Sequence, residues 1–246
     1  MANPFKDIKE LTRDVESYLR KNRSAIYNNS KRISDFFEMA CYNNIVRFYE
    51  NNNYDVEIKN LQKNKFKYKC TTAGNPANYS FFEVKRKIGT IEFIFEIRHN
   101  LNVQSYHNSD TFTTPDICII KPNSIEEDDD FYDSKMKYYY VSNKSLISFC
   151  EVKNFNPYPE LLFNFIGVVN ELRPNLLRPV KQSGVSHIST TLMVSGKSNK
   201  HASRIITNLQ SRYHINVLSD LFNIGGVTFG RHSIKKVKTV WNKNGI

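Results

Sequence analysis

Three charged residues stand at the ends of apolar runs, where a charge is costly unless it is paired, solvated or bound to a metal ion. Asp116 opens the apolar segment 117–120, and Glu151 and Lys153 close the segment 146–153. Carboxylate oxygens are the ligands that Mg²⁺ and Mn²⁺ prefer, and a neighbouring lysine can hold a phosphate group. These residues predict a metal-dependent site that acts on phosphate, and they argue against a zinc centre.

The spacing of the second segment places its two charges together. In a strand, side chains alternate between faces, so Glu151 and Lys153 share one face and Val152 takes the other. If Asp116 lies on a neighbouring strand, its carboxylate and that of Glu151 can share one ion. Such an ion lowers the pKa of a bound water molecule, and Lys153 would then orient that water or stabilise charge in the transition state.

A further acid, Glu38, falls on the inward stripe of a predicted helix over 35–51, together with Cys41 and Ile45. A carboxylate on an inward stripe needs a partner, and a metal ion or its water would be one. The alternative is a capping box, in which Asp35 caps the helix and Glu38 bonds back to its N–H.

A second Glu-x-Lys stands at Glu83 and Lys85. No Pro-Asp pair precedes it and no buried helix follows it, so we interpret it as a solvent-facing strand edge. Among other polar residues near the site, Asn156 and Tyr158 are candidate phosphate contacts or simple turn residues. His107 and Asp110 are candidates for the lining of a cleft.

The elements that must position these residues indicate an α/β fold. Hydrophobic periodicity and turn residues predict helices over 5–23, 35–51, 159–172 and 200–213. The predicted strands are 54–61, 66–71, 78–87, 90–99, 116–121, 138–141, 146–153, 188–195 and 215–218.

Between the strands, residues 122–137, with the acidic run Glu126 to Asp130, are predicted to form a solvated loop. We expect one domain, with an N-terminal helical elaboration over 1–32, a core over about 34–195 and a basic C-terminal part over 196–246.

The motif and the order of elements resemble the PD-(D/E)XK nuclease superfamily. Pro115-Asp116 followed by Glu151-Val152-Lys153 is the literal match. The family core runs helix, three antiparallel strands, helix and strand, so the resemblance implies a restriction-endonuclease-like core, with a central mixed β-sheet flanked by helices. The gap of 35 residues between Asp116 and Glu151 is long, and the acidic loop accounts for it as an insertion within a hairpin.

The resemblance implies a Mg²⁺-dependent endonuclease, with Mn²⁺ as a substitute, acting on DNA by in-line attack of a water molecule. Asp116 and Glu151 would hold the metal ion, helped by the Val152 carbonyl, while Lys153 positions the nucleophile and Glu38 supports it. It also implies a homodimer if both strands are cut, and a role in restriction or phage defence. Two alternatives stay open: a nuclease-like module that binds without cutting, and an RNase or structure-specific resolvase with the same site.

The net charge of +11 lies in the C-terminal part of the chain. Residues 172–246 hold twelve Lys and Arg against one acid, Asp220, whereas residues 1–171 hold 23 of each sign. Lysine and arginine bind polyanions by releasing counterions from phosphates, so nucleic acid is the predicted partner, against the alternative of a generically basic protein. The candidate nucleic-acid contacts are Lys181, Lys197, Lys200, Lys235, Lys236 and Lys238.

Four cysteines, at 41, 70, 118 and 150, lie far apart without metal-ligand spacing, which argues against a zinc finger and a disulfide scaffold. The chain has no apolar run long enough for a membrane span, and residues 1–32 lack the apolar core of a signal peptide. We therefore expect no membrane partner and a cytoplasmic location.

Overall fold

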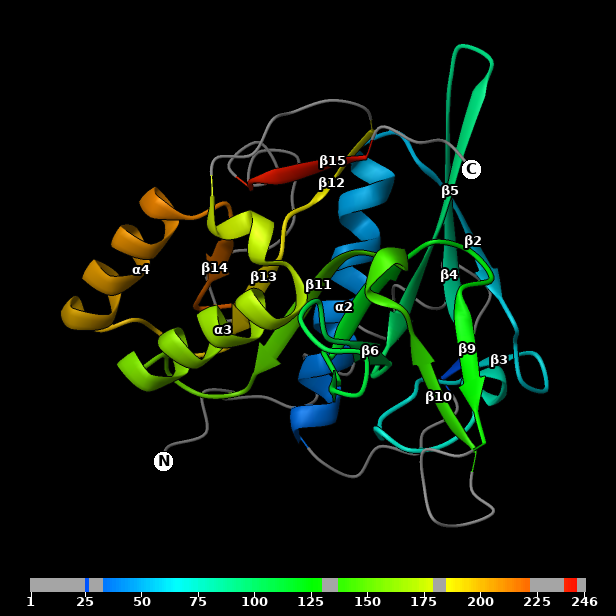
Figure 1. Cartoon of the computed structure of the whole chain (residues 1–246), viewed down its shortest axis with the longest axis horizontal. Helices are drawn as coiled ribbons and strands as arrows, with labels where there is room; N and C mark the ends of the chain where they lie inside the picture. Colours follow the sequence, from blue (N-terminus) through cyan, green and yellow to red (C-terminus); the bar gives the residue numbers. More distant parts are fainter. Residues whose placement is uncertain (1–24, 27–32, 130–136, 179–184, 222–236, 243–246) are drawn as a thin grey trace.

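The computed structural model describes residues 25–26, 33–129, 137–178, 185–221 and 237–242. Within these residues the chain forms a layered α/β structure, as the sequence predicts (Figure 1). The predicted helix over 5–23 lies outside the described residues.

A mixed seven-stranded sheet forms the middle layer. Its strands in spatial order are β14 (Asn216–Leu218), β13 (Thr191–Val194), β11 (Leu146–Lys153), β8 (Ile117–Ile120), β5 (Ile91–His99), β4 (Phe81–Ile88) and β2 (Asp55–Lys59). From β2 to β11 each neighbouring pair is antiparallel, and β11, β13 and β14 run parallel. The start of β8 and the end of β11 therefore lie at the same edge of the sheet.

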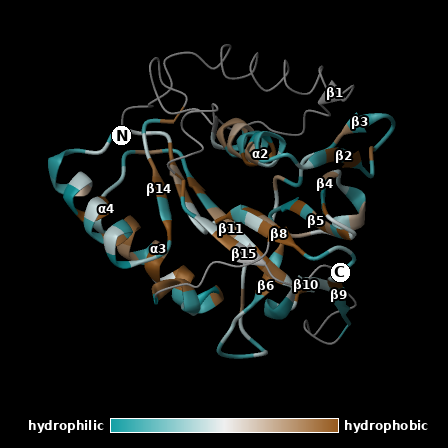
Figure 2. Cartoon of the chain, turned by 90° about the horizontal axis from the view of Figure 1, so that it is seen from above, coloured by the Kyte–Doolittle hydropathy of each residue, from teal (hydrophilic) through white to brown (hydrophobic). Residues whose placement is uncertain are grey.

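Helices cover the sheet on both faces (Figure 2). The α-helices in the described residues are α2 (Ile33–Asn51), α3 (Pro159–Leu172) and α4 (Lys200–Arg212). Helix α2 packs against one face in a cluster that includes Ile117, Ile119 and Val152. Helices α3 and α4 pack against the other face, in a cluster that includes Cys118 and Phe149. Successive side chains of a strand point to opposite faces, so each central strand contributes apolar side chains to both clusters.

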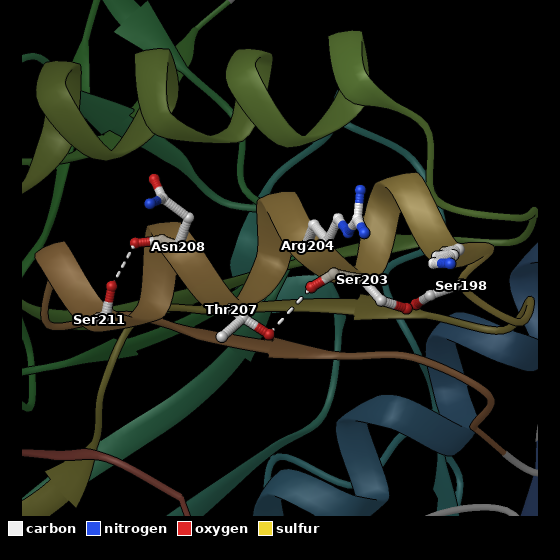
Figure 3. Close-up of a pocket in the computed structure, with 7 residues that line it drawn as sticks. Ser198, Ser203, Arg204, Thr207, Asn208 and Ser211 are labelled. Carbon is white, nitrogen blue, oxygen red and sulfur yellow. Dashed lines mark hydrogen bonds between the residues drawn. The ribbon is translucent and has the colours of Figure 1, made fainter.

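The two helices on the second face show why the sequence predicted them well. Pro159 starts α3, where its missing N–H costs nothing, and the helix ends before Pro174. Helix α4 is capped by Asn199, whose side chain accepts a hydrogen bond of 2.8 Å from the backbone N–H of Ala202. Its apolar side packs on the protein, and its opposite side presents polar residues (Figure 3).

The predicted loop over 122–137 is partly wrong. Residues Ile125–Asp128 form strand β9, which pairs antiparallel with β10 (Tyr138–Val141). These strands join a four-stranded sheet with β6 (Asn102–Gln104) and β7 (Phe112–Thr113). The acidic residues form a strand because its neighbour offers partners: the Tyr140 hydroxyl donates to Glu126 over 3.0 Å. Residues 130–136 lie outside the described residues.

The remaining elements are short. Strand β1 (Ala25–Ile26) pairs with β3 (Lys65–Phe66), and β12 (Val185–Ile188) pairs with β15 (Thr239–Asn242). Single 3₁₀ turns occur at Pro76–Asn78, Asn143–Ser145 and Pro174–Leu177. Two predicted strands differ from these bounds. In the segment 66–71, only the first residue belongs to a strand. The segment 188–195 is divided between β12 and β13, because Ser189 and Thr190 lie between the two strands.

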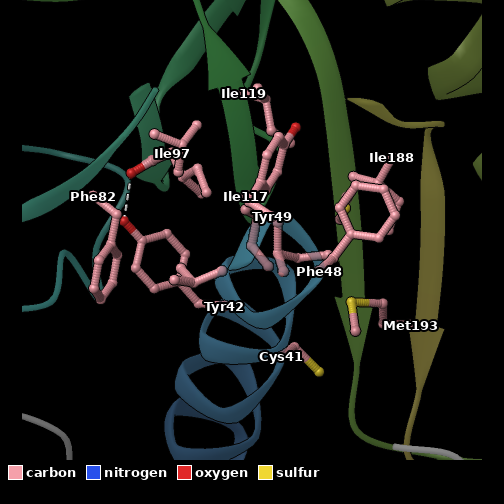
Figure 4. Close-up of a cluster of buried hydrophobic side chains, with 14 of the residues drawn as sticks. Cys41, Tyr42, Phe48, Tyr49, Phe82, Ile97, Ile117, Ile119, Ile188 and Met193 are labelled. Carbon is pink, nitrogen blue, oxygen red and sulfur yellow. Dashed lines mark hydrogen bonds between the residues drawn. The ribbon is translucent and has the colours of Figure 1, made fainter. Parts of the chain in front are cut away.

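Aromatic side chains from α2 fill the core between this helix and the sheet (Figure 4). Tyr42, Phe48 and Tyr49 are fully buried. The Tyr42 hydroxyl donates to the carbonyl of Ile97 over 2.5 Å, which satisfies a polar group that would otherwise destabilise the core. This contact fixes the helix against the middle of the sheet.

One buried residue of the core is a histidine with a strongly shifted pKa. His187, in β12, is fully buried, and its Nδ1 lies 3.1 Å from the Tyr49 hydroxyl. Its ring also packs edge-on to Phe95, with ring centroids 4.3 Å apart. Burial, together with the charge of Arg173, lowers the pKa of His187 to about 3. The folded protein therefore holds this imidazole in its neutral form.

Acid should destabilise the fold through His187. Between pH 6.5 and about 3, His187 binds a proton in the unfolded chain but not in the folded chain. The contribution of His187 to the free energy of unfolding is therefore at its maximum above pH 6.5 and decreases as the pH falls below that value. From pH 6.5 to 4.5 the loss should be roughly 2 kcal/mol larger in the wild type than in His187→Gln. Urea unfolding of both proteins measures this difference, and other titrating groups cancel in the comparison. Parallel pH profiles would contradict the assignment.

All four cysteines are free, as the sequence predicts, and three of them are buried. No helix in the described part of the chain is both long and apolar enough to cross a membrane.

Candidate active site

The sheet register brings the three predicted charges together. Ile117 pairs with Cys150 across β8 and β11, so Asp116, just before β8, lies beside the end of β11. The Asp116 carboxylate accepts a hydrogen bond of 2.6 Å from the backbone N–H of Val152. This bond holds the Asp116 carboxylate next to the Glu-x-Lys segment, as the sequence predicted.

Lys153 lies between the two carboxylates. Its Nζ is 2.8 Å from Glu151 Oε2 and 3.0 Å from Asp116 Oδ2. The Lys153 side chain is 32% exposed, and those of Asp116 and Glu151 are 13% and 12% exposed. One cation is thus shared by two nearly buried carboxylates, with an opening to solvent on the lysine side.

The electrostatics follow from this crowding. Burial and then the nearby Asp116 raise the pKa of Glu151 to about 7. Burial raises the pKa of Asp116 as well, against the attraction of Lys153 and with a further rise from the Glu38 charge. For Lys153, burial alone would lower the pKa, but Glu151 and Asp116 outweigh it and raise the pKa above its ordinary value. The site stabilises positive charge at its centre.

Glu38 comes from the other direction, on the first turns of α2. Its Oε2 lies 3.5 Å from Nε2 of His99, the last residue of β5. The capping alternative does not apply as predicted, because α2 begins at Ile33 and Asp35 lies inside its first turn. Glu38 therefore faces the site edge, close enough to act on Asp116 electrostatically, and among the described residues its carboxylate pairs with His99.

Sequence reasoning missed the scaffold behind Asp116. The Asn100 backbone N–H donates to the Asp116 carbonyl over 3.0 Å. Asn100 adopts a positive φ of 50°, which asparagine tolerates. The buried Lys69 ammonium donates to the carbonyls of Thr71, Thr72 and Asn100, and burial lowers its pKa to about 8. In the sequence Lys69 follows Lys65 and Lys67 in a run that alternates with Phe66, Tyr68 and Cys70, so its residue type did not distinguish it from a solvent-facing lysine.

The second Glu-x-Lys has a different environment. Lys85 lies 2.9 Å from Glu83 and 3.5 Å from Glu57 on the neighbouring strand, and Glu57 is half exposed. These residues form surface ion pairs at the side of the sheet that β2 borders. The ion pairs are open to solvent on the Glu57 side, but β4 is not the edge of the sheet, because β2 lies outside it, and the Glu83 side chain is only 17% exposed.

Of the other polar candidates, two lie near the site and two lie away from it. Asn156 packs against Gly196, and Tyr158 is the exposed residue before α3, so both lie at the site edge. His107 does not: its Nε2 lies 3.0 Å from the Asn170 carbonyl, near the far end of α3. Asp110 is in the same exposed loop, with its backbone N–H bonded to Asn108.

The lysines predicted to contact nucleic acid also differ in their surroundings. Lys200 is exposed at the start of α4, and Lys197 is exposed with its Nζ 3.9 Å from Asp220. Lys238 is a correction: its ammonium donates to the carbonyls of Gln210 and Tyr213 at the end of α4, where a cation stabilises the helix. Lys181, Lys235 and Lys236 lie outside the described residues.

No family model, no curated protein and no solved structure matches the chain.

The carboxylates of the candidate site are a small donor set for the predicted metal ion. Among the described residues, no group of three or more His, Cys, Asp or Glu side chains is placed to hold a metal. Asp116 and Glu151 nevertheless present oxygens to one cationic atom, Lys153 Nζ. Mg²⁺ commonly uses one or two carboxylates and fills its other positions with water and substrate oxygens. Two carboxylates around a cation therefore fit Mg²⁺ or Mn²⁺ better than zinc.

Proposed function

We propose that this chain is a metal-dependent nuclease that hydrolyses phosphodiester bonds in DNA. The observation that carries the proposal is the position of Lys153 Nζ, shared by two nearly buried carboxylates from adjacent strands. Buried charges of this kind are expensive to maintain, and they cluster at sites that perform chemistry.

The order of elements supports a restriction-endonuclease-like core as part of the proposal. Helix α2, the antiparallel strands β5, β8 and β11, helix α3 and the parallel strand β13 occur in the order that the resemblance implies, with further strands, among them β2 and β4, between them in the sequence. The connection between β8 and β11 contains the β9–β10 hairpin, which accounts for the long gap between Asp116 and Glu151.

Each residue then has a role. Asp116 and Glu151, with the Val152 carbonyl, would hold Mg²⁺ or Mn²⁺, which when bound lowers the pKa of water and neutralises phosphate charge. Lys153 would leave the carboxylates and turn toward the scissile phosphate through the solvent-facing side of the site. There its ammonium would stabilise the charge that develops as the water oxygen bonds to phosphorus and the bond to the leaving sugar oxygen breaks. Glu38 would orient the attacking water.

A cleavage assay with several substrates tests this function. We expect plasmid DNA to be cut with Mg²⁺ or Mn²⁺ and to stay intact with EDTA. Single-stranded DNA and RNA in parallel reactions decide between a DNase and an RNase. Binding without cleavage under all conditions would favour the non-cutting alternative.

Asp116→Asn should abolish cleavage and weaken Mg²⁺ or Mn²⁺ binding. The substitution keeps an oxygen for the Val152 N–H but removes one of the two charges that hold the ion. Titration calorimetry with Mn²⁺ measures the binding, and gel assays measure the cleavage. Removal of a negative charge from the site should also leave DNA affinity unchanged or stronger.

The matched control is Glu83→Gln, which neutralises a carboxylate that also pairs with a lysine but lies on β4, away from the candidate site. It should cleave as the wild type does. Cleavage that persists in Asp116→Asn and in EDTA would refute the assignment.

A further inference from the structure

A shallow hollow of about 720 Å³ lies along the exposed side of α4 (Figure 3). Every residue that lines it has a side chain able to form hydrogen bonds, and none is apolar or acidic. The lining residues are Ser198, Lys200, Ser203, Arg204, Thr207, Asn208 and Ser211. We call this set the α4 face.

The charge of the α4 face is one-sided. Helix α4 contains Lys200, Arg204 and Arg212 and no Asp or Glu. The only acid after Glu171 in the sequence, Asp220, lies 3.9 Å from Lys197 and not beside Lys200 or Arg204. Neither of these two cations has an ion pair within the described residues, and both are exposed. The face therefore attracts anions with little internal compensation.

Not every polar group of the face is available to a ligand. The Thr207 hydroxyl donates to the Ser203 carbonyl over 3.0 Å, and the Ser211 hydroxyl donates to the Asn208 carbonyl over 2.8 Å. The groups without such a bond in the described structure are the ammonium of Lys200, the hydroxyl of Ser203, the guanidinium of Arg204 and the side-chain amide of Asn208. Lys200, Arg204 and Asn208 follow one another at four-residue spacing, roughly 6 Å apart along the helix axis.

The fold joins the α4 face to the candidate active site. Strands β11 and β13 are parallel, so Lys153 at the end of β11 and the start of α4 after β13 lie at the same edge of the sheet. The two segments beyond these strands touch: the Ser195 backbone N–H donates to the Lys153 carbonyl over 3.2 Å. A ligand that extends from the site along this edge reaches Lys200 first and Arg204 next.

We infer that the α4 face binds the sugar-phosphate backbone of the nucleic acid that enters the site, through Lys200, Arg204 and Asn208. This inference rests on the proposed function and adds a strand-tracking surface to it. Repeated donors at regular spacing, without a base-sized apolar contact, suit a repeating phosphate ligand and predict sequence-independent binding. An acidic protein segment is the competing partner, and the experiment separates the two.

The test compares two double variants that each remove two positive charges. Lys200→Gln/Arg204→Gln changes the α4 face, and Lys121→Gln/Lys144→Gln changes exposed lysines at the opposite edge of the sheet. Binding of a fluorescent 30-base-pair duplex is measured in EDTA over a range of salt concentrations, using the full chain. The α4 variant should bind at least about tenfold more weakly at 0.1 M salt, with a salt slope smaller by about 1.8. The control should bind as the wild type does.

Three results would overturn the inference: an unchanged affinity in the α4 variant, an equal loss in the control pair, or competition by polyglutamate as strong as by unlabelled duplex. Failure of the inference differs from failure of the proposed function. If the wild type cleaves with Mg²⁺ but the α4 variant binds normally, only the surface is misassigned. If the wild type neither binds nor cleaves nucleic acid, the proposed function fails with it.

Discussion

Lys153→Ala should reduce the rate of metal-dependent cleavage by roughly 100- to 1,000-fold, the usual cost of removing a preorganised charge that stabilises a transition state. The charge matters most as the phosphate gains negative charge, so the loss should fall on the chemical step and leave substrate affinity nearly unchanged. Single-turnover cleavage at saturating DNA measures that step. Lys85→Ala, which removes the lysine of the surface Glu-x-Lys, is the control and should cleave normally.

The structure adds a second expectation for Lys153→Ala. Without the ammonium, the carboxylates of Asp116 and Glu151 lose the cation that they share, so the variant should be less stable in EDTA. Mg²⁺ should then raise the melting temperature of the variant more than that of the wild type, where the lysine competes for the same oxygens. Full activity in Lys153→Ala with loss in Lys85→Ala would move the active site to β4. Equal activity in both variants would point to a contaminating nuclease.

Gly196→Ala should destabilise the protein by roughly 2–4 kcal/mol, because the new Cβ meets a backbone that has no room to move. That Cβ would lie 2.1 Å from Asn156 Oδ1, 2.5 Å from Asn156 Cα and 2.7 Å from Asn156 N. The side-chain oxygen can rotate away, but the two backbone atoms cannot do so without moving the segment. The segment is also bonded to the residues that follow β13, since the Gly196 N–H donates to the Phe155 carbonyl over 3.2 Å.

Urea unfolding measures this effect, and Gly167→Ala is its matched control. Gly167 lies on the exposed side of α3 with nothing within 4 Å of an added Cβ, so alanine there should stabilise the helix by up to about 1 kcal/mol. Because the segment after Lys153 carries the clash, Gly196→Ala should also lower cleavage at temperatures where the protein is still folded. A Gly196→Ala protein as stable as the wild type would show that the close approach is not required.

Local signals predicted much of the fold. The turn at Gly89 was predicted from a glycine between alternating strands, and Gly89 has a φ of 61° that suits it. Helix α3 has the predicted bounds because a proline marks its first turn and another follows its end. The two halves of the candidate site lie together because strand alternation and antiparallel pairing act within a few residues of the motif.

Long-range contacts explain what the sequence did not predict. Strand β9 exists because Tyr139 and Tyr140 of β10 offer partners to its acidic residues, and an isolated acidic run does not reveal that pairing. Lys238 was assigned to nucleic acid on charge alone, but the end of α4 takes its ammonium. The roles of His99 and Lys69 could not be predicted, because they depend on the packing of β5 and of the segment after β3 next to Asp116. Each of these residues acts on groups distant in sequence.

The antiparallel pairing of β8 and β11 places the chain that connects them at the side of the molecule where inserted residues would be tolerated. The end of β8 and the start of β11, which this connection joins, lie at the edge of the sheet opposite Asp116 and Lys153, and β9 and β10 lie between them in the sequence. Chain added there would extend away from the catalytic edge and leave the register of the two strands intact. This connection is therefore the natural place to graft an affinity handle or a fluorescent reporter, and the place where homologous chains should differ most in length.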